Sequence, residues 1–550
     1  MPVISLNWSE LEKLVGADRE AIIKKLPMIG CSIERVCDEQ IDVEFFPNRP
    51  DLYSIEGIAR ALRGFLDIER GYKNYTVKKG KWKIHVDPSV KGVRPRIVGC
   101  VVKNLKLTDE VVKSLIELQE DLHWTIGRNR RKMAIGLHDL DRFSFPLKYT
   151  AVSGNFSFIP LDCNNKMSVS QILKEHPKGI EFGFILENKD KYPMIIDSEG
   201  DAISFPPIIN AEKTRITERT RNLFIDVTGF DENVDRALNI LATMLSDRGG
   251  VIESVEVIYP EKSFFTPDLS PKTMEVKKSE IYSLLGFKIS DDELKVSLER
   301  MRFGVNKITE KTIKVKIPPY RADIMHEWDI IEDIAIGYGY DRIKPEYPRT
   351  ITIGESHAWN DIKEIIREIM IGLGFLEVIT FTLSNERVQY EFVNRKAMPW
   401  KDYVPVMHPL TEDHTIIRTD ILPKLLELLS FNKHYPMPQK IFEIGDVVVN
   451  LHNELRVCGC ITHFKANFAE IRSIVQALMR ELNLNWDVEE SDDGAFIEGR
   501  QAKIIVNGKE IGIFGEINPE VLERFRLTNP VVAFEINLTK IFESDLKEIL

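Results

Sequence analysis

The sequence predicts a multidomain α+β protein. Its 550 residues, 43% of them hydrophobic, are enough for about three to five domains that each bury a core. Strand and helix patterns follow one another irregularly, and no tandem repeat or low-complexity tract is present. We therefore expect compact domains with short linkers: an N-terminal module (1–84), an α+β domain (85–265), a small acidic module (266–345) and a C-terminal domain (346–550).

Charge and composition narrow the functional classes. The net charge of −11 argues against a nucleic acid wrapped over a broad surface, so any RNA contact should be local. The six scattered cysteines form no CxxC pair, and the histidines show no zinc-binding spacing. No membrane-spanning run or signal peptide is visible, so we expect a cytoplasmic protein without a membrane or DNA partner. The basic clusters are Lys78, Lys79, Lys81 and Lys83, then Arg128, Arg130, Arg131 and Lys132, then Arg215, Arg219 and Arg221.

The N-terminal module begins with apolar residues at helical spacing from Leu11 to Leu26. Two prolines then interrupt the chain before a second helix, which Ser54 is placed to cap. Between the prolines, Arg49 and Asp51 can form an ion pair that braces a domain junction. We prefer this structural interpretation to a catalytic role.

The second domain reads as short strands with intervening helices. RIVGCVVKNL (96–105) and AIGLHDLDRF (134–143) predict strands, and GIEFGFIL (179–186) carries a further strand signal. FIDVTG (224–229) predicts a strand that ends at a tight turn, and a long amphipathic helix should begin near Glu232.

Polar residues on the strand at 223–228 predict a binding pocket. Asp226 and Thr228 alternate around Val227, so both project from one face of the strand. Ser204 and Asn210 are placed to complete the pocket, and His138 to line it. The alternative is that Asp226 and Thr228 only form a side-chain turn or cap before the helix.

The acidic module contains four carboxylates near one helix start. If the helix begins shortly after Asp323, then Asp329, Glu332 and Asp333 share one face at i, i+3 and i+4. A hard cation such as Mg²⁺ would offset their repulsion. The alternative is that Asp323 caps the helix and the other acids lie on its solvated first turns.

These motifs resemble a known family. PPYRADI (318–324) followed by EWDIIEDIAIGYGYDRI (327–343) resembles the B5 domain of the β subunit of phenylalanine-tRNA synthetase. The resemblance implies a helix-turn-helix-like domain with Mg²⁺ at the interface with the catalytic α subunit. It assigns the ligands to Asp323, Asp329, Glu332 and Asp333, with Asp333 standing where Glu is common.

The second domain is similar to the B3/B4 editing domain of archaeal members. FPPIINAEKT (205–214) and DVTG (226–229) carry this similarity, which implies hydrolysis of tRNA mischarged with tyrosine. Such a site distinguishes tyrosine from phenylalanine by the phenolic hydroxyl, whose buried partners would otherwise stay unpaired. No Ser-His-Asp or Cys-His arrangement is evident, so a positioned water is the expected nucleophile.

Residues 408–448 resemble the class II synthetase-like domain of the same β subunit. An active class II site has Arg two residues before the Glu of its second motif, where this chain has Ile441 before Glu443. The domain should therefore form no adenylate, and the chain also lacks a Walker loop.

The resemblance as a whole implies the β subunit of an α2β2 enzyme that uses ATP, Mg²⁺, phenylalanine and tRNA(Phe). ATP would be a substrate of the α subunit. A nucleic-acid-binding regulator is a first alternative, disfavoured because Asp329, Glu332 and Asp333 would repel phosphates. A free-standing aminoacyl-tRNA hydrolase is the second.

Overall fold

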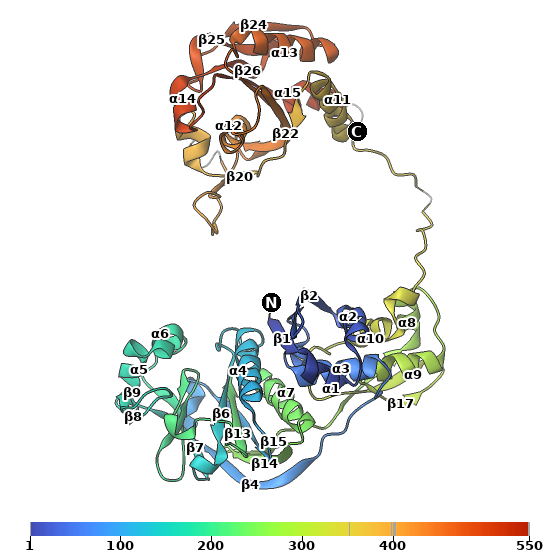
Figure 1. Cartoon of the computed structure of the whole chain (residues 1–550), viewed down its shortest axis with the longest axis vertical. Coiled ribbons are helices and arrows are strands. Elements are labelled where there is room, and N and C mark those ends of the chain that lie inside the picture. The colour runs from blue at the N-terminus through green and yellow to red at the C-terminus, as the bar shows by residue number, and fades with distance from the viewer. Residues whose placement is uncertain (1, 351, 398, 400–402, 548–550) are drawn as a thin grey trace. The chain divides into compact units, whose positions relative to one another are not determined.

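The computed structural model describes residues 2–350, 352–397, 399 and 403–547, in two compact units, Met1–Tyr347 and Pro348–Leu550 (Figure 1). The described residues between 343 and 357 contain no helix or strand. Each unit has its own hydrophobic core, as expected for a multidomain chain.

The N-terminal unit begins with a three-stranded antiparallel sheet in the order β1-β3-β2. Asn7 caps α1 and Ser54 caps α3, each by accepting a hydrogen bond from a backbone N–H in the first turn. The elements are β1 (Val3–Asn7), α1 (Trp8–Val15), α2 (Arg19–Lys25), β2 (Cys31–Val36), β3 (Gln40–Phe45) and α3 (Ile55–Phe65).

A ten-stranded mixed sheet follows, in the order β12-β11-β10-β7-β4-β14-β5-β13-β6, with β15 paired to β14. Two long helices, α4 (Asp109–Trp124) and α7 (Asn233–Asp247), bury apolar faces in the core shared with β5, β6 and β13. The strands are β4 (Val77–Val86), β5 (Arg96–Lys103), β6 (Met133–Asp139), β7 (Leu147–Val152), β10 (Tyr192–Ile196), β11 (Ala202–Phe205), β12 (Ile209–Asn210), β13 (Leu223–Gly229), β14 (Val251–Ile258) and β15 (Ser263–Thr266).

Two sequence-based expectations need correction in this region. The boundary expected at residue 84 falls inside β4, which pairs in parallel with β14 and therefore belongs to the large sheet. The segment 179–186 is helical instead of a strand, because α6 (Pro177–Phe182) starts with a proline and packs against α5 (Val169–Glu175). Gly179 permits that packing, since a Cβ there would lie 1.7 Å from the carbonyl oxygen of Ile172.

A second small sheet, β16-β18-β17, closes the N-terminal unit together with three helices. Gly286 ends α8 with a φ of 80°, as its turn position predicts. The small strands β8 (Ser157–Phe158) and β9 (Met167–Ser168) pair beside the large sheet. The closing elements are β16 (Lys272–Lys277), α8 (Lys278–Leu285), α9 (Asp291–Arg300), β17 (Gly304–Ile308), β18 (Thr312–Ile317) and α10 (Glu327–Tyr338).

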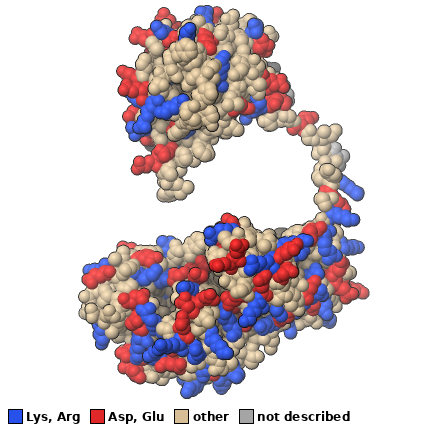
Figure 2. Space-filling model, viewed as in Figure 1, with Lys and Arg blue, Asp and Glu red and all other residues tan. Residues whose placement is uncertain are grey.

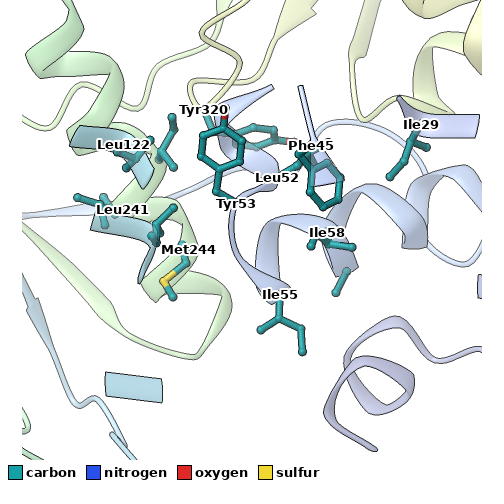
Figure 3. Close-up of a cluster of buried hydrophobic side chains, with 14 of the residues drawn as sticks. Ile29, Phe45, Leu52, Tyr53, Ile55, Ile58, Leu122, Leu241, Met244 and Tyr320 are labelled. Carbon is teal, nitrogen blue, oxygen red and sulfur yellow. The ribbon is translucent and has the colours of Figure 1, made fainter. Parts of the chain in front are cut away.

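One hydrophobic core joins these parts (Figure 3). Phe45 and Ile58 of the N-terminal module, Leu122 of α4 and Met244 of α7 belong to the same cluster of buried side chains as Tyr320, beyond β18. The first 347 residues therefore behave as one packed body.

The C-terminal unit is a seven-stranded sheet in the order β19-β22-β23-β27-β26-β25-β24. Helices α11 and α13 share a core with one face of the sheet, and α12 shares a core with the other. The elements are α11 (Ala358–Gly372), β19 (Leu376–Glu377), β20 (Leu383–Ser384), β21 (Ile416–Ile417), α12 (Leu422–Phe431), β22 (Gln439–Val449), β23 (His452–Thr462), α13 (Phe468–Glu481), β24 (Trp486–Glu490), β25 (Phe496–Val506), β26 (Lys509–Ile517), α14 (Pro519–Arg524), β27 (Val531–Asn537) and α15 (Leu538–Lys547).

Candidate functional site

A cavity of about 250 Å³ lies in the large sheet of the N-terminal unit. Its wall is formed by β6, by the β11–β12 turn, by β13 and by the side of α4. Three of the five residues expected in the pocket line it: Ser204, Asn210 and Asp226. Because the wall combines apolar residues with a few polar groups, it suits a small organic ligand.

Asp226 is the buried charge of this cavity, with 1% of its surface exposed. His138, which is fully buried behind it, places Nε2 2.8 Å from Asp226 Oδ1. The other ring nitrogen of His138 lies 2.8 Å from the hydroxyl of Thr214. His138 therefore links the carboxylate of Asp226 to the hydroxyl of Thr214 and holds the carboxylate in place.

Ser204 and Asn210 face each other across the antiparallel β11–β12 pair. The Ser204 hydroxyl donates to Asn210 Oδ1 at 2.9 Å, and the Asn210 amide donates to the carbonyl of Leu137 at 3.3 Å. Both side chains are thus fixed in the cavity wall.

Thr228 does not line the cavity, so its expected place in the wall is wrong. It shares a strand face with Asp226, but its hydroxyl is fully buried and accepts a hydrogen bond from Arg94 Nε at 2.9 Å. His138 also stands behind the wall and supports Asp226 from there. Strand alternation predicts the face of a side chain but not the depth at which a cavity ends.

Charged residues that sequence reasoning did not assign to the pocket also line the cavity. Arg130, from a basic cluster, is buried and donates to Glu120 at 2.6 Å and to the carbonyl of Ile208 at 3.0 Å. Lys178 of α6, which pairs with Glu181, and Arg215, which pairs with Asp162 and Glu212, also line the wall. A basic cluster next to predicted pocket strands is the signal that would have found Arg130.

Four carboxylates of the acidic module lie near the start of α10, but they do not form one cluster. Arg321 is buried and makes two hydrogen bonds to Asp323, at 2.9 and 2.6 Å, and a further one to Asp333. Burial raises the pKa of Asp333 to about 6. Asp323 and Asp333 are therefore occupied by a guanidinium.

The other two acids remain available to a cation. Asp329 accepts the backbone N–H groups of Met325 and His326 with one oxygen, at 2.8 and 2.7 Å. Glu332 is exposed on the next turn of α10. The residue that caps α10 is His326, so the alternative in which Asp323 caps this helix is wrong.

Two carboxylates at i and i+3 fit Mg²⁺, which keeps several waters and takes one or two carboxylates from a protein. Asp323 and Asp333 are paired with Arg321, whereas Asp329 and Glu332 have no ion-pair partner among the described residues. In the described part of the chain, the only set of three carboxylates within metal-binding distance is Asp197, Glu199 and Asp201, and Lys213 bridges it.

The expected ion pair between Arg49 and Asp51 is present. Arg49 makes two parallel hydrogen bonds to Asp51, at 2.8 and 2.9 Å, and both residues are buried. The guanidinium of nearby Arg60 stacks 3.7 Å from the Tyr320 ring centroid. These contacts join the N-terminal module to the acidic module.

In the C-terminal unit, Ile441 is buried in β22 beneath α12. Glu443, two residues later on the same face, is buried in an ion pair with Arg418 at 2.7 Å. Its second oxygen accepts from the Thr380 hydroxyl, also at 2.7 Å. No helix among the described residues is long and apolar enough to cross a membrane.

Comparisons with known proteins point to the same family along the whole chain. Residues 343–538 match the family model described as the phenylalanyl tRNA synthetase beta chain CLM domain, and residues 274–340 match the tRNA synthetase B5 domain. The phenylalanine–tRNA ligase beta subunit of Archaeoglobus fulgidus is 66% identical over 544 residues, which cover 99% of each chain. That of Methanococcoides burtonii is 49% identical over 98% of this chain and 100% of the relative.

A solved structure extends the agreement to the fold. It is an N-terminal fragment of the phenylalanyl-tRNA synthetase beta subunit from Pyrococcus horikoshii, 40% identical, with a TM-score of 0.60 over 62% of this chain and 100% of the fragment. Together with the full-length identity to curated relatives, these matches show that the chain belongs to the family of phenylalanine–tRNA ligase β subunits.

Proposed function

We propose that the chain is the β subunit of a cytoplasmic α2β2 phenylalanine–tRNA ligase and that it hydrolyses Tyr-tRNA(Phe) in the cavity at Asp226. The α subunit binds ATP and phenylalanine and attaches phenylalanine to tRNA(Phe). In this assignment the large sheet is the B3/B4 editing domain, residues 274–340 are the helix-turn-helix-like B5 domain, and the C-terminal unit is a class II synthetase-like domain without its chemistry.

The observation that carries the editing proposal is the buried carboxylate of Asp226 in a cavity of about 250 Å³. Drug-sized ligands occupy pockets of about 300–1,000 Å³, so this one suits a single amino acid side chain. His138 occupies one oxygen of Asp226, and the other oxygen accepts no hydrogen bond within the described chain. That oxygen can accept the phenolic O–H of tyrosine, which phenylalanine lacks.

For the hydrolysis of the Tyr-tRNA ester, the protein mainly has to position the substrate and the attacking water. Asp226 and the Ser204–Asn210 pair hold the amino acid. A water attacks the ester carbonyl, and the tRNA 3′-terminal hydroxyl leaves with a proton. Catalysis is then mainly orientation.

Mg²⁺ belongs to the same proposal, with Asp329 and Glu332 as its protein ligands at the contact with the α subunit. The ion would screen the negative charge at the start of α10 and stabilise that contact. Asp323 and Asp333 instead hold Arg321 in the core.

The experiment is hydrolysis of preformed Tyr-tRNA(Phe) by the assembled heteromer. Asp226→Ala should slow hydrolysis by about tenfold to a hundredfold, because a hydrogen bond to a charged acceptor contributes about 1.5–3 kcal/mol. Charging with phenylalanine should be unchanged. Asp201→Ala, an exposed acid in the same domain, is the matched control. Unchanged hydrolysis in a folded Asp226→Ala enzyme would refute the assignment of the site.

A further inference from the structure

A basic surface with embedded aromatic rings follows β4, apart from the cavity wall. Figure 2 shows lysine and arginine side chains gathered at the lower margin of the N-terminal unit, where Figure 1 draws β4. We call this region the β4 surface. It consists of Lys78, Lys79, Lys81, Trp82, Lys83, Lys103 and Phe145.

The backbone of β4 leaves one side of this region open. β4 pairs with β14 over most of its length, but with β7 only through Ile84, His85 and Val86. Residues 77–83 therefore form an exposed strand edge with no neighbour on the β7 side. Lys78, Lys79, Lys81 and Lys83 are all exposed along that edge.

The aromatic rings border an open hollow of about 640 Å³. Trp82 and Phe145 lie with ring centroids 5.0 Å apart. The Nζ atoms of Lys81 and Lys103 lie 5.3 and 5.0 Å from the Trp82 ring centroid. Basic groups beside partly exposed aromatic rings are a combination with which proteins hold single-stranded nucleic acid.

The positive charge is only partly neutralised by the protein itself. Lys83 pairs with Glu256 at 3.4 Å, and Lys103 with Glu253 at 3.0 Å. Within the described residues, no carboxylate lies within 4.0 Å of the Nζ atoms of Lys78, Lys79 or Lys81. Three unpaired lysines side by side in a chain of net charge −11 complement a polyanion.

We propose that the β4 surface binds a single-stranded segment of the tRNA, with the lysines on phosphates and the aromatic rings against bases. This inference rests on the proposed function, because the tRNA is that reaction's substrate. Asn222 lines the hollow and Asp226 lines the cavity, four residues or about 13 Å apart along one extended segment. RNA held at the β4 surface is thus close to the editing cavity.

Lysines on an open strand edge also have a simpler role, since they discourage edge-to-edge pairing between sheets. That role does not require Trp82 and Phe145 to border a hollow. It also predicts no change in RNA affinity when the lysines are replaced, so one experiment separates the two explanations.

The test measures tRNA(Phe) binding by the assembled heteromer as a function of salt, using fluorescence anisotropy. The triple variant Lys78→Gln, Lys79→Gln, Lys81→Gln should lower the slope of log affinity against log salt by about 2, since each contact to single-stranded phosphate contributes about 0.7. At 0.1 M salt, a slope lower by about 2 corresponds to tRNA binding by the variant that is up to about a hundredfold weaker than binding by the wild type. Phe145→Leu should weaken binding without changing the slope.

The matched control is the triple variant Lys307→Gln, Lys311→Gln, Lys314→Gln, which removes the same charge from exposed positions of β17, β18 and their connection. It should bind tRNA as wild type does. Equal salt slopes for the two triple variants would overturn the inference.

The same measurements keep the two proposals apart. At saturating tRNA the β4 variant should hydrolyse Tyr-tRNA at the wild-type rate, because the lysines do not line the cavity. If the wild-type heteromer binds tRNA but does not hydrolyse Tyr-tRNA, the editing proposal fails and the β4 surface is still judged by its salt slope.

Discussion

Asp226 has room beside His138 only because the neighbouring strand carries a glycine. Gly136 pairs with Asp226 in the β6–β13 register. A Cβ at position 136 would lie 2.2 Å from Asp226 Oδ1 and 2.6 Å from His138 Nε2. The absence of a side chain at one position therefore permits the central polar contact of the candidate site.

Gly136→Ala is expected to displace Asp226 while leaving the strand intact, because alanine tolerates extended backbone and the added methyl meets only side chains. Tyr-tRNA hydrolysis by the heteromer should fall at least about tenfold, the effect of losing one hydrogen bond to a charged acceptor. Phenylalanine charging should not change. Gly92→Ala, whose Cβ would meet nothing within 4 Å, serves as control. Equal hydrolysis rates in both variants would contradict this geometry.

At the scale of the element, α10 combines a structural ion pair and a candidate cation site. Asp323 and Asp333 both pair with the buried Arg321, whereas Glu332 is exposed and Asp329 is partly exposed. Four acids that look equivalent in the sequence therefore have two different roles.

Replacing both Asp329 and Glu332 with Ala should abolish Mg²⁺ retention and weaken the heteromer, because the ion loses both of its protein carboxylates. Metal content of the purified complex and its mass by light scattering measure the two effects. Asp292→Ala with Glu310→Ala removes the same charge from exposed positions nearby and should change neither. If the double mutant assembles normally at limiting Mg²⁺, then Asp329 and Glu332 are only solvated residues on the helix surface.

Helix α4 carries a pH-sensitive contact to the sheet. His123 is 2% exposed, and its Nε2 accepts the backbone N–H of Ile135 at 2.8 Å, so the ring must be neutral there. Burial lowers the pKa of His123 to about 4. An unfolded histidine titrates near 6.5, so the unfolded chain takes up the proton first as the pH falls.

The contribution of His123 to stability is therefore complete above about pH 6.5 and is lost progressively toward pH 4. Between pH 7.5 and 5 the free energy of unfolding should fall by about 2 kcal/mol through this residue. Urea denaturation of wild type and His123→Gln at both pH values measures the difference. If the two proteins show the same pH dependence, His123 is not the titrating group.

At the scale of the whole molecule, we expect the C-terminal unit to catalyse no aminoacylation. Ile441 stands where the sequence resemblance implies an ATP-binding arginine, and Glu443 is engaged by Arg418 and Thr380.

The purified chain alone should make no Phe-tRNA, whereas the heteromer with its α subunit should. Ile441→Arg should not create the activity, because Glu443 stays paired with Arg418. Aminoacylation assays on the chain alone, on the heteromer and on the Ile441→Arg variant test these expectations. Robust charging by the chain alone would show that adenylate forms in this subunit.

Much of this protein is determined by local sequence. The strand at Asp226, the helix that follows it, the turn at Gly286 and the acidic start of α10 all follow from periodicity and turn residues, which act within a few positions of the chain. The lack of an arginine at position 441 is likewise a fact of sequence alone.

Tertiary structure decided which polar groups meet. Register between β6 and β13 placed His138 against Asp226, packing turned the Thr228 hydroxyl to Arg94, and folding paired Arg321 with Asp323 and Asp333. Segment 179–186 became helical through contacts with α5, against its strand pattern. These outcomes depend on partners distant in sequence, whose desolvation and hydrogen bonding no local pattern encodes.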